Sequence, residues 1–238
     1  MNVLIVYAHP EPRSFNGALK DLAIKTLEEQ GHFVKVSDLY EMNFNPVANK
    51  QDFLELENHE FFKYQMEQIA AVKKDTFTED IKTEIEKLKW ADFVLFQFPL
   101  WWLSVPAILK GWVDRVFTMG WLYGPGVGLY DQGGLKGKKA MLSVTTGGPE
   151  TMFSKNGISG DMMDQVLHHI NRGILSFSGM EVLPPFVSYG AAHHEELRKQ
   201  YLETFKERLL SLETTPSTPY HPNSHYDSTM QLKSEFRG

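Results

Sequence analysis

The chain has 238 residues, of which 42% are hydrophobic and 23% are charged, a composition typical of a folded globular protein. Its 30 acidic residues outnumber its 24 basic residues, and the resulting net charge of −6 argues against binding to nucleic acid or an anionic membrane. The chain has no cysteine, which excludes disulfides, thiolate metal sites and a cysteine nucleophile. The sequence contains no apolar run near the roughly 18 residues of a membrane span and no basic start of a signal peptide. We therefore expect a cytoplasmic protein.

Short apolar runs alternate with helical patterns along the chain. The apolar runs predict five strands, at Val3–Tyr7, Phe33–Val36, Phe93–Phe98, Lys139–Thr145 and Val182–Ser188, of which the first is expected to be buried on both faces. Helical spacing of apolar residues predicts helices between them, at 19–27 (ending at Gly31), 81–88 (behind Thr78), 108–117, 163–174 and 197–212. This alternation favours an α/β fold, a doubly wound parallel sheet with right-handed crossovers.

Two segments lie outside the alternation. The connection Asp38–Phe77 is long, and we expect short helices near Phe61–Val72. Residues 214–238 are polar and contain three prolines. The sequence therefore predicts one domain over residues 1–213 and a C-terminal tail over residues 214–238. This tail is either disordered or packed against another surface.

In an open α/β sheet, a ligand binds beyond the carboxyl ends of the strands, where the strand order reverses. For a five-stranded sheet of order 2-1-3-4-5, this point lies between the first and third strands. The segments that follow the first, third and fourth strands are residues 8–16, 98–106 and 145–148. We expect these three segments to converge on one site.

The first segment leads into a helix and carries N-cap residue types at Ser14 and Asn16, with His9 and Arg13 as further donors. The free N–H groups at such a helix start suit a phosphate group, although an ordinary capped helix explains the same residues. Neither G-x-x-x-x-G-K-[ST] nor G-x-G-x-x-G is present, which argues against nucleoside triphosphate hydrolysis and a Rossmann dinucleotide site.

The second and third segments are also unusual. Trp101 and Trp102 lie in a loop between prolines, where either a flat aromatic ligand or a packed neighbouring segment or subunit would cover them. Thr145-Thr146-Gly147-Gly148 ends a strand, either as a simple turn or as an edge where backbone amides approach a planar ligand. Together, a phosphate site, an aromatic platform and a glycine edge describe a site for a flavin nucleotide.

The chain resembles the NAD(P)H:quinone oxidoreductases, the DT-diaphorase family, which have a flavodoxin-like fold. The resemblance is carried by VLIVYAHPEPRSFNGAL (residues 3–19), SDLYEMNF (37–44), FQFPLWWLSVPAILKGWVDRVF (96–117) and LSVTTGG (142–148). It implies a homodimer that binds FAD, with FMN as the less favoured flavin. It also implies that NADH or NADPH reduces quinones by two electrons, in a ping-pong transfer of hydride through the flavin.

The resemblance also assigns site residues. The cofactor-binding positions that it implies are His9, Ser14, Phe15, Asn16, Ala18, Pro99, Leu100, Trp101, Trp102, Leu103, Thr145, Thr146, Gly147, Gly148, Phe153 and Arg198. The implied substrate-binding positions are Tyr123, Gly124, Pro125 and Phe177, the last contributed by the other subunit.

The chain departs from the family pattern at several positions. Phe153 stands where relatives often have a tyrosine, and Ser159 where they have a histidine or asparagine, so the proton relay assigned to those residues is absent here. The flavin carries the hydride in this interpretation, no catalytic side chain is assigned, and Ser159 is only a weak candidate. Arg172 and Ser176 stand where one branch has two metal-binding histidines, so no metal is expected. His168 and His169 are adjacent and diverge by about 100° on a helix, so they cannot bind a metal ion together. We expect both of them, as well as His193 and His194, to be exposed helix residues.

Three other functions share these motifs. One is a flavin reductase of the same fold that acts on nitroaromatics, azo dyes or free flavin. Another is a flavodoxin-like regulatory subunit of a glutathione-gated potassium efflux system. The third is a one-electron carrier, which needs no wall of side chains above the flavin.

Overall fold

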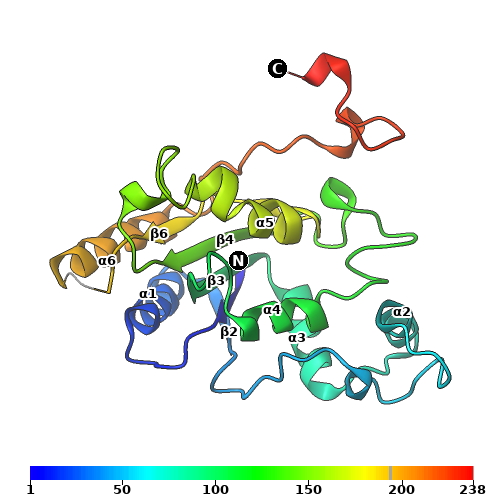
Figure 1. Ribbon diagram of the computed structural model, residues 1–238. Coiled ribbons are helices and arrows are strands. Elements are labelled where there is room, and N and C mark those ends of the chain that lie inside the picture. The colour runs from blue at the N-terminus through cyan, green and yellow to red at the C-terminus, as the bar shows by residue number, and fades with distance from the viewer. Residues whose placement is uncertain (193–194, 238) are drawn as a thin grey trace.

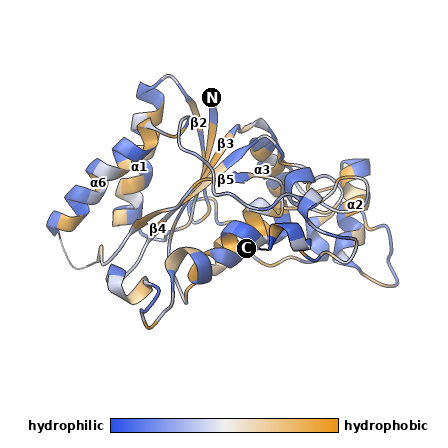
Figure 2. Ribbon diagram, turned by 90° about the horizontal axis from the view of Figure 1, so that it is seen from above, coloured by the Kyte–Doolittle hydropathy of each residue, from blue (hydrophilic) through white to orange (hydrophobic). Residues whose placement is uncertain are grey.

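The computed structural model describes residues 1–192 and 195–237, and His193 and His194 therefore lie outside the described residues. The chain forms one parallel sheet between two layers of helices (Figures 1 and 2). The strands are β1 (Asn2–Tyr7), β2 (Phe33–Asp38), β3 (Phe93–Pro99), β4 (Lys139–Thr145), β5 (Glu181–Val182) and β6 (Phe186–Ser188). The main helices are α1 (Phe15–Glu29), α2 (Tyr64–Lys74), α3 (Glu79–Trp90), α4 (Ala107–Val116), α5 (His168–Ile170) and α6 (Glu195–Leu210).

The strand order β2-β1-β3-β4-β5, with β6 also paired to β4, confirms the predicted flavodoxin-like arrangement. The expected continuous fifth strand over Val182–Ser188 is wrong, because Pro184 and Pro185 separate β5 from β6. Proline has no N–H to donate to the sheet, so the pairing to β4 is interrupted there and resumes at Ser143 and Phe186.

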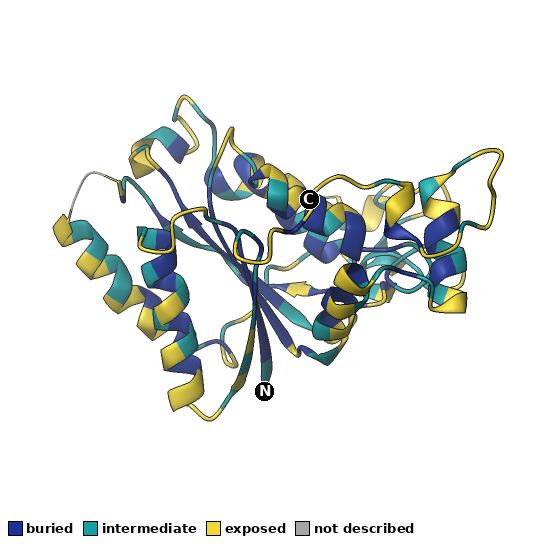
Figure 3. Ribbon diagram, turned by 90° about the horizontal axis from the view of Figure 1, so that it is seen from below, coloured by how far each residue is buried: buried dark blue, intermediate teal, exposed yellow. Residues whose placement is uncertain are grey.

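The two faces of the sheet are covered by different helices. α1 and α6 pack side by side over one face, where Leu19, Leu27 and Phe205 are completely buried (Figure 2). α3, α4 and the segment around α5 cover the other face, with Trp112 buried at its centre. Because both faces are covered, the central strands are buried along almost their whole length, as Figure 3 shows.

The ends of α1 are as the sequence predicts. The Ser14 Oγ accepts a hydrogen bond from the Gly17 N–H at the start of the helix. Gly31 has φ +78° just beyond the end, which a residue without a side chain adopts easily.

The helix predicted over residues 163–174 has a different form. It consists of two π-helical segments, Met162–Val166 and Asn171–Ser176, on either side of the short α5. His168 and His169 are exposed on it, as expected. Among the described residues, no helix is long and apolar enough to cross a membrane.

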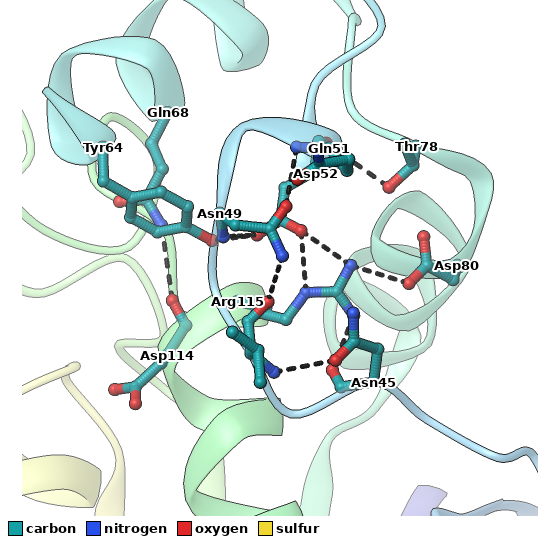
Figure 4. Close-up of polar contacts among 11 residues, drawn as sticks. Asn45, Asn49, Gln51, Asp52, Tyr64, Gln68, Thr78, Asp80, Asp114 and Arg115 are labelled. Atoms are coloured by element: carbon teal, nitrogen blue, oxygen red, sulfur yellow. Dashed lines mark hydrogen bonds and ion pairs between the residues drawn. The ribbon is translucent and has the colours of Figure 1, made fainter. Parts of the chain in front are cut away.

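The long connection 38–77 is fixed to α4 by buried charges (Figure 4). The Arg115 guanidinium donates to the Asp52 carboxylate from Nε at 3.1 Å and lies 3.0 Å away at Nη2, and both side chains are almost fully buried. The same guanidinium pairs with Asp80 at 2.9 Å and donates to the Asn45 carbonyl at 2.9 Å. The Tyr64 hydroxyl from α2 donates to the second Asp52 oxygen at 2.6 Å. This connection therefore belongs to the folded core.

Candidate functional site

A cavity of about 290 Å³ opens at the carboxyl edge of the sheet, and we call it the edge cavity. Strand pairing brings the three predicted segments together here, because Tyr7 aligns with Gln97 and Pro99 aligns with Thr145. The residues that line the edge cavity are His9, Ser14, Phe15, Asn16, Pro99, Leu100, Trp101, Thr145, Thr146, Gly147, Ala191 and Ala192. The expected convergence of these segments at one point is thus what the fold produces.

A buried chain of side-chain hydrogen bonds forms the floor of this edge. The Gln97 Nε2 donates to the Asn16 Oδ1 at 2.9 Å, and the Asn16 Nδ2 donates to the Thr145 Oγ1 at 2.9 Å. All three residues are buried. This chain ties the start of α1 to the ends of β3 and β4, so the Asn16 side chain is already engaged, and only its backbone can serve a ligand.

The start of α1 is built for an anion. Among the hydrogen bonds of the described residues, the N–H groups of Phe15 and Asn16 have no partner, and both residues line the edge cavity. A side-chain carbon at Gly17 would overlap the Pro12 carbonyl oxygen, so only glycine allows the preceding loop to lie this close to the helix. Free N–H groups and the helix dipole together favour a phosphate group at this point.

Two charged residues of the loop before α1, Glu11 and Arg13, form an ion pair with each other. The Arg13 Nε donates to the Glu11 carboxylate at 2.9 Å. This hydrogen bond lowers the pKa of Glu11 to about 2, although both groups are exposed to solvent. The His9 Nδ1 accepts a hydrogen bond from the Glu11 N–H at 3.1 Å, and the other ring nitrogen, Nε2, has no partner among the described residues.

The Thr-Thr-Gly-Gly segment presents open backbone to the edge cavity. Nothing lies within 4 Å of the position that a side-chain carbon would take at Gly147. The Thr146 Oγ1 donates to the Gly148 carbonyl at 2.7 Å, whereas the N–H groups of Gly147 and Gly148 have no partner among the described residues. The segment can therefore donate two backbone hydrogen bonds to the edge of a planar ligand.

The tryptophan loop forms a tight turn. Trp101 and Ser104 exchange backbone hydrogen bonds of 3.1 and 3.0 Å across the turn. Trp102 and Leu103, at its tip, both have positive φ, 53° and 56°, which is uncommon for side chains of this size. Trp101 lines the edge cavity, whereas Leu103 and Trp102, which is 100% exposed, do not line it.

A second cavity, of about 480 Å³, adjoins the edge cavity and shares Ser14, Phe15, Ala191 and Ala192 with it. Ala18 from α1 and Arg198 from α6 line it. The Arg198 Nη1 donates to the Ala191 carbonyl at 3.1 Å, which fixes the guanidinium at the wall. Because the two cavities share these four residues, they lie next to each other; Trp101 lines the first and Arg198 lines the second, and we call the pair the long hollow.

Comparison with known proteins gives consistent matches. The family described as having a flavodoxin-like fold matches residues 1–211. Ribosyldihydronicotinamide dehydrogenase (quinone) of Mus musculus is 49% identical over 212 residues, which are 88% of this chain and 91% of the mouse protein. NAD(P)H dehydrogenase (quinone) 1 of Cavia porcellus is 43% identical over 230 residues, 96% of this chain and 83% of the guinea-pig protein.

A crystal structure described as that of a quinone reductase from Klebsiella pneumoniae superposes with a TM-score of 0.94. The two chains are 41% identical, and the match covers 99% of this chain and 95% of the other. This chain belongs to the flavodoxin-like quinone dehydrogenase family. The resemblance found in the sequence is thereby confirmed.

Two of the four predicted substrate residues line a different cavity. Tyr123 and Phe177 line a hollow of about 320 Å³ against α4, and their ring centroids are 5.7 Å apart. No residue lines both this hollow and the edge cavity. Gly124, with φ +105°, and the exposed Pro125 continue the chain beside Tyr123. Within one chain, the fold does not bring these four residues to the edge cavity.

Phe153 and Ser159 line neither of the two joined cavities. Phe153 is buried, and its ring centroid lies 5.9 Å from that of Tyr189. The Ser159 N–H donates to the Met152 carbonyl at 3.0 Å, so this residue closes a local turn. The assignment of Phe153 to the cofactor and of Ser159 to catalysis stays a prediction.

The positions of the histidine ligands of one family branch are occupied differently. The Arg172 Nη1 donates to the Ser176 Oγ at 3.0 Å. Within residues 1–192 and 195–237, no group of three histidine, aspartate or glutamate side chains is arranged to hold a metal ion.

Sequence reasoning missed Gln97, Gly17, Ala191 and Ala192. The alanines follow β6, whose carboxyl end lies at the same sheet edge as the others, so the rule used for three strands also applied to the fifth. Gly17 is the third residue of α1, a position where glycine is unfavourable unless close packing demands it. Gln97 is a polar residue within an otherwise apolar strand, which is itself a signal of a buried hydrogen-bond network.

Proposed function

We propose that this chain is an FAD-dependent NAD(P)H:quinone oxidoreductase that reduces quinones by two electrons. The observation that carries the proposal is the long hollow formed by the edge cavity and the second cavity. It offers a slot beside Trp101, N–H groups at the start of α1 without a partner among the described residues, and a basic end at Arg198. The similar proteins of Mus musculus and Cavia porcellus are named as quinone dehydrogenases.

The residues present fit a flavin nucleotide. The Trp101 ring, Pro99 and Leu100 offer one wall for the flat ring system, and the free N–H groups of Gly147 and Gly148 offer donors to its polar edge. The Phe15 and Asn16 N–H groups suit a diphosphate. The second cavity, with Ala18 and Arg198, leaves room for an adenosine, which favours FAD over FMN.

A bound flavin supplies the two-electron transfer between a reduced nicotinamide and a quinone. The chain's own residues position the planar groups in the slot and stabilise charge that develops on them. Backbone N–H groups at Gly147 and Gly148 stabilise negative charge at the edge of the slot without having to reorganise. Trp101 lines one side of the slot and would position a planar group against it. In this proposal no side chain acts as an indispensable acid or base.

We also propose a homodimer with the active site between the chains. The Tyr123–Phe177 hollow is separate from the edge cavity within one chain, so a second copy is needed to bring the two together. The exposed Trp102 at the strained turn is a large apolar side chain that a partner would cover. Light scattering at micromolar concentration should give twice the chain mass of 27.3 kDa. A mass of one chain contradicts this arrangement.

The decisive experiment identifies the flavin and measures turnover with the same preparation. We expect a yellow protein that releases FAD on heating and reduces a soluble quinone with NADH, NADPH or dihydronicotinamide riboside. Protein without flavin after reconstitution contradicts the proposal. Flavin that is bound without turnover in the absence of a membrane partner favours the regulatory-subunit alternative. A cytoplasmic location is part of the proposal that the chain is a quinone oxidoreductase.

Arg198→Ala tests the choice of flavin. Loss of a hydrogen bond from a charged group typically lowers affinity by about tenfold, so FAD binding should weaken by that order while FMN binding stays unchanged. Lys206→Ala, on an exposed position of the same helix, is the control. Equal effects on FAD and FMN would show that the second cavity does not hold the adenosine.

A further inference from the structure

The C-terminal tail folds back onto the body of the protein. After α6, the Thr218 N–H donates to the Val182 carbonyl at 2.7 Å. Further on, the Asn223 N–H donates to the Asp131 carboxylate at 2.7 Å, and the Asn223 Nδ2 donates to the Leu129 carbonyl at 2.8 Å. Figure 1 shows the tail, in orange and red, running along the side of the molecule that carries α5. The tail therefore meets the loop that follows Tyr123.

Arg172 joins the tail to this loop. Its guanidinium lies 4.2 Å from the centre of the Tyr130 ring in the loop and 4.9 Å from the centre of the Tyr220 ring in the tail. Its Nη2 lies 3.5 Å from the Tyr226 hydroxyl, also in the tail. No carboxylate among the described residues forms an ion pair with it. The cation is thus engaged by aromatic rings and hydroxyl groups.

Tyr130 connects Arg172 to the predicted substrate side chains. Its N–H donates to the Phe177 carbonyl at 2.8 Å, and the two rings meet edge to face with centroids 5.3 Å apart. Phe177 in turn packs against Tyr123 at 5.7 Å. Tyr130 also has φ +53°, a conformation that a non-glycine residue keeps only where its surroundings hold it. We call Tyr123, Tyr130 and Phe177 the aromatic wall.

We propose that Arg172 and the tail form a clamp that holds the aromatic wall in position for the quinone. Arg172 is a positioning residue in this proposal, because its contacts reach the substrate only through Tyr130 and Phe177. Tyr220 is the tail's part of the clamp. The inference rests on the proposed function, since it assumes that Phe177 faces a flat aromatic substrate.

Two variants open the clamp at different points, and one conserves it. Arg172→Gln removes the cation, Tyr220→Leu removes the tail ring, and Tyr220→Phe keeps the ring while removing only the hydroxyl. With a two-ring quinone, we expect the first two variants to raise KM about three- to tenfold, with kcat within about twofold of wild type. Tyr220→Phe should behave as wild type, and flavin content should be equal in all four proteins.

Hydrogen–deuterium exchange provides a readout that needs no turnover. The Tyr130 N–H, bonded to the Phe177 carbonyl, should exchange faster in Arg172→Gln and Tyr220→Leu than in wild type or Tyr220→Phe. If exchange at Tyr130 is unchanged in both opened variants, the clamp does not exist. If exchange rises but KM for the quinone does not, the clamp holds the loop without positioning the substrate, and the proposal fails.

The two proposals can fail separately. If the wild-type protein with flavin bound reduces no quinone, the proposed function is wrong and the clamp has no quinone to position. The exchange at Tyr130 then still reports whether Arg172 and Tyr220 hold the loop. If the wild-type protein turns over and Arg172→Gln keeps the wild-type KM, only the clamp proposal is overturned.

Discussion

The connection 38–77 and the tail 214–237 both lie outside the strand–helix alternation, but they are attached to the body by different forces. The connection buries Phe53 and Phe77 and places Asp52 and Arg115 against each other away from water (Figure 4). The tail makes half-buried ring contacts and a few hydrogen bonds to loop carbonyls. The two segments therefore differ greatly in the free energy needed to detach them from the body. The connection should unfold only with the whole domain, whereas the tail can open locally.

The largest effect is expected at Arg115. Replacing it by methionine leaves the Asp52 carboxylate buried without its cation, which typically costs about 3–5 kcal/mol of unfolding free energy. Chemical denaturation measures this loss. Lys110→Met on the same helix is the control, because Lys110 and Asp114 form an exposed ion pair that contributes about 1 kcal/mol or less.

A second variant keeps the test informative if Arg115→Met fails to fold. Asp52→Asn combined with Arg115→Met removes both charges, and it should recover part of the stability lost by Arg115→Met alone. If the double variant is no more stable than the single one, the buried ion pair is not what holds the connection.

Gly111→Ala tests the contact between the connection and α4 sterically. A side-chain carbon at Gly111 would overlap the backbone of Pro46, so the connection must move away from the helix. Overpacking of this kind costs about 1–3 kcal/mol. Gly173→Ala is the matched control, since nothing lies within 4 Å of its added carbon. Equal unfolding midpoints for the two variants would contradict the close approach of Pro46.

Asp80 makes the attachment of the connection sensitive to acid. Burial alone would raise its pKa, but the Thr78 hydrogen bond and the Arg115 guanidinium together hold the pKa of Asp80 below its usual value of 3.8. Because this pKa is lowered in the folded state, Asp80 adds stability above about pH 4, and this contribution is lost as the pH falls through the folded-state pKa.

Asp80→Asn should therefore be less stable than wild type near pH 7, and the difference should shrink below about pH 4. Thermal melts over this pH range measure it. Since the Asp80 side chain is 43% exposed, the expected effect is modest. A difference that grows toward acid pH would show that the sign of the shift is wrong.

The smallest effect is expected in the tail. Asn223→Ala removes the side-chain hydrogen bond to the Leu129 carbonyl, and the global unfolding free energy should fall by about 1 kcal/mol or less. Amide exchange around residues 129–131 should rise more clearly than the unfolding midpoint falls. A large loss of global stability would show that the tail, like the connection, is part of the domain core. The division at residue 213 stays a prediction until such a measurement is made.

The sequence by itself determined the sheet and the place of the edge cavity. Continuous apolar runs specify strands buried on both faces, Ser14 and Gly31 specify the ends of α1, and parallel strands deliver their carboxyl ends to one edge. These signals are local, since each depends on residues within a few positions of one another. The break at Pro184 and Pro185 was equally local and could have been predicted from the missing N–H groups.

The tertiary structure decided what no local pattern specifies. It decided that Asp52 is buried and paired with Arg115, 63 positions away, and that Gln97, Asn16 and Thr145 share one buried chain of hydrogen bonds. It also decided that a polar tail brings Tyr220 to Arg172. The sequence does not distinguish a charged or aromatic side chain that is exposed to water from one that contacts a partner residue. Only the packing of distant segments fixes which of the two it meets, because burial and stacking depend on contacts between residues far apart in the chain.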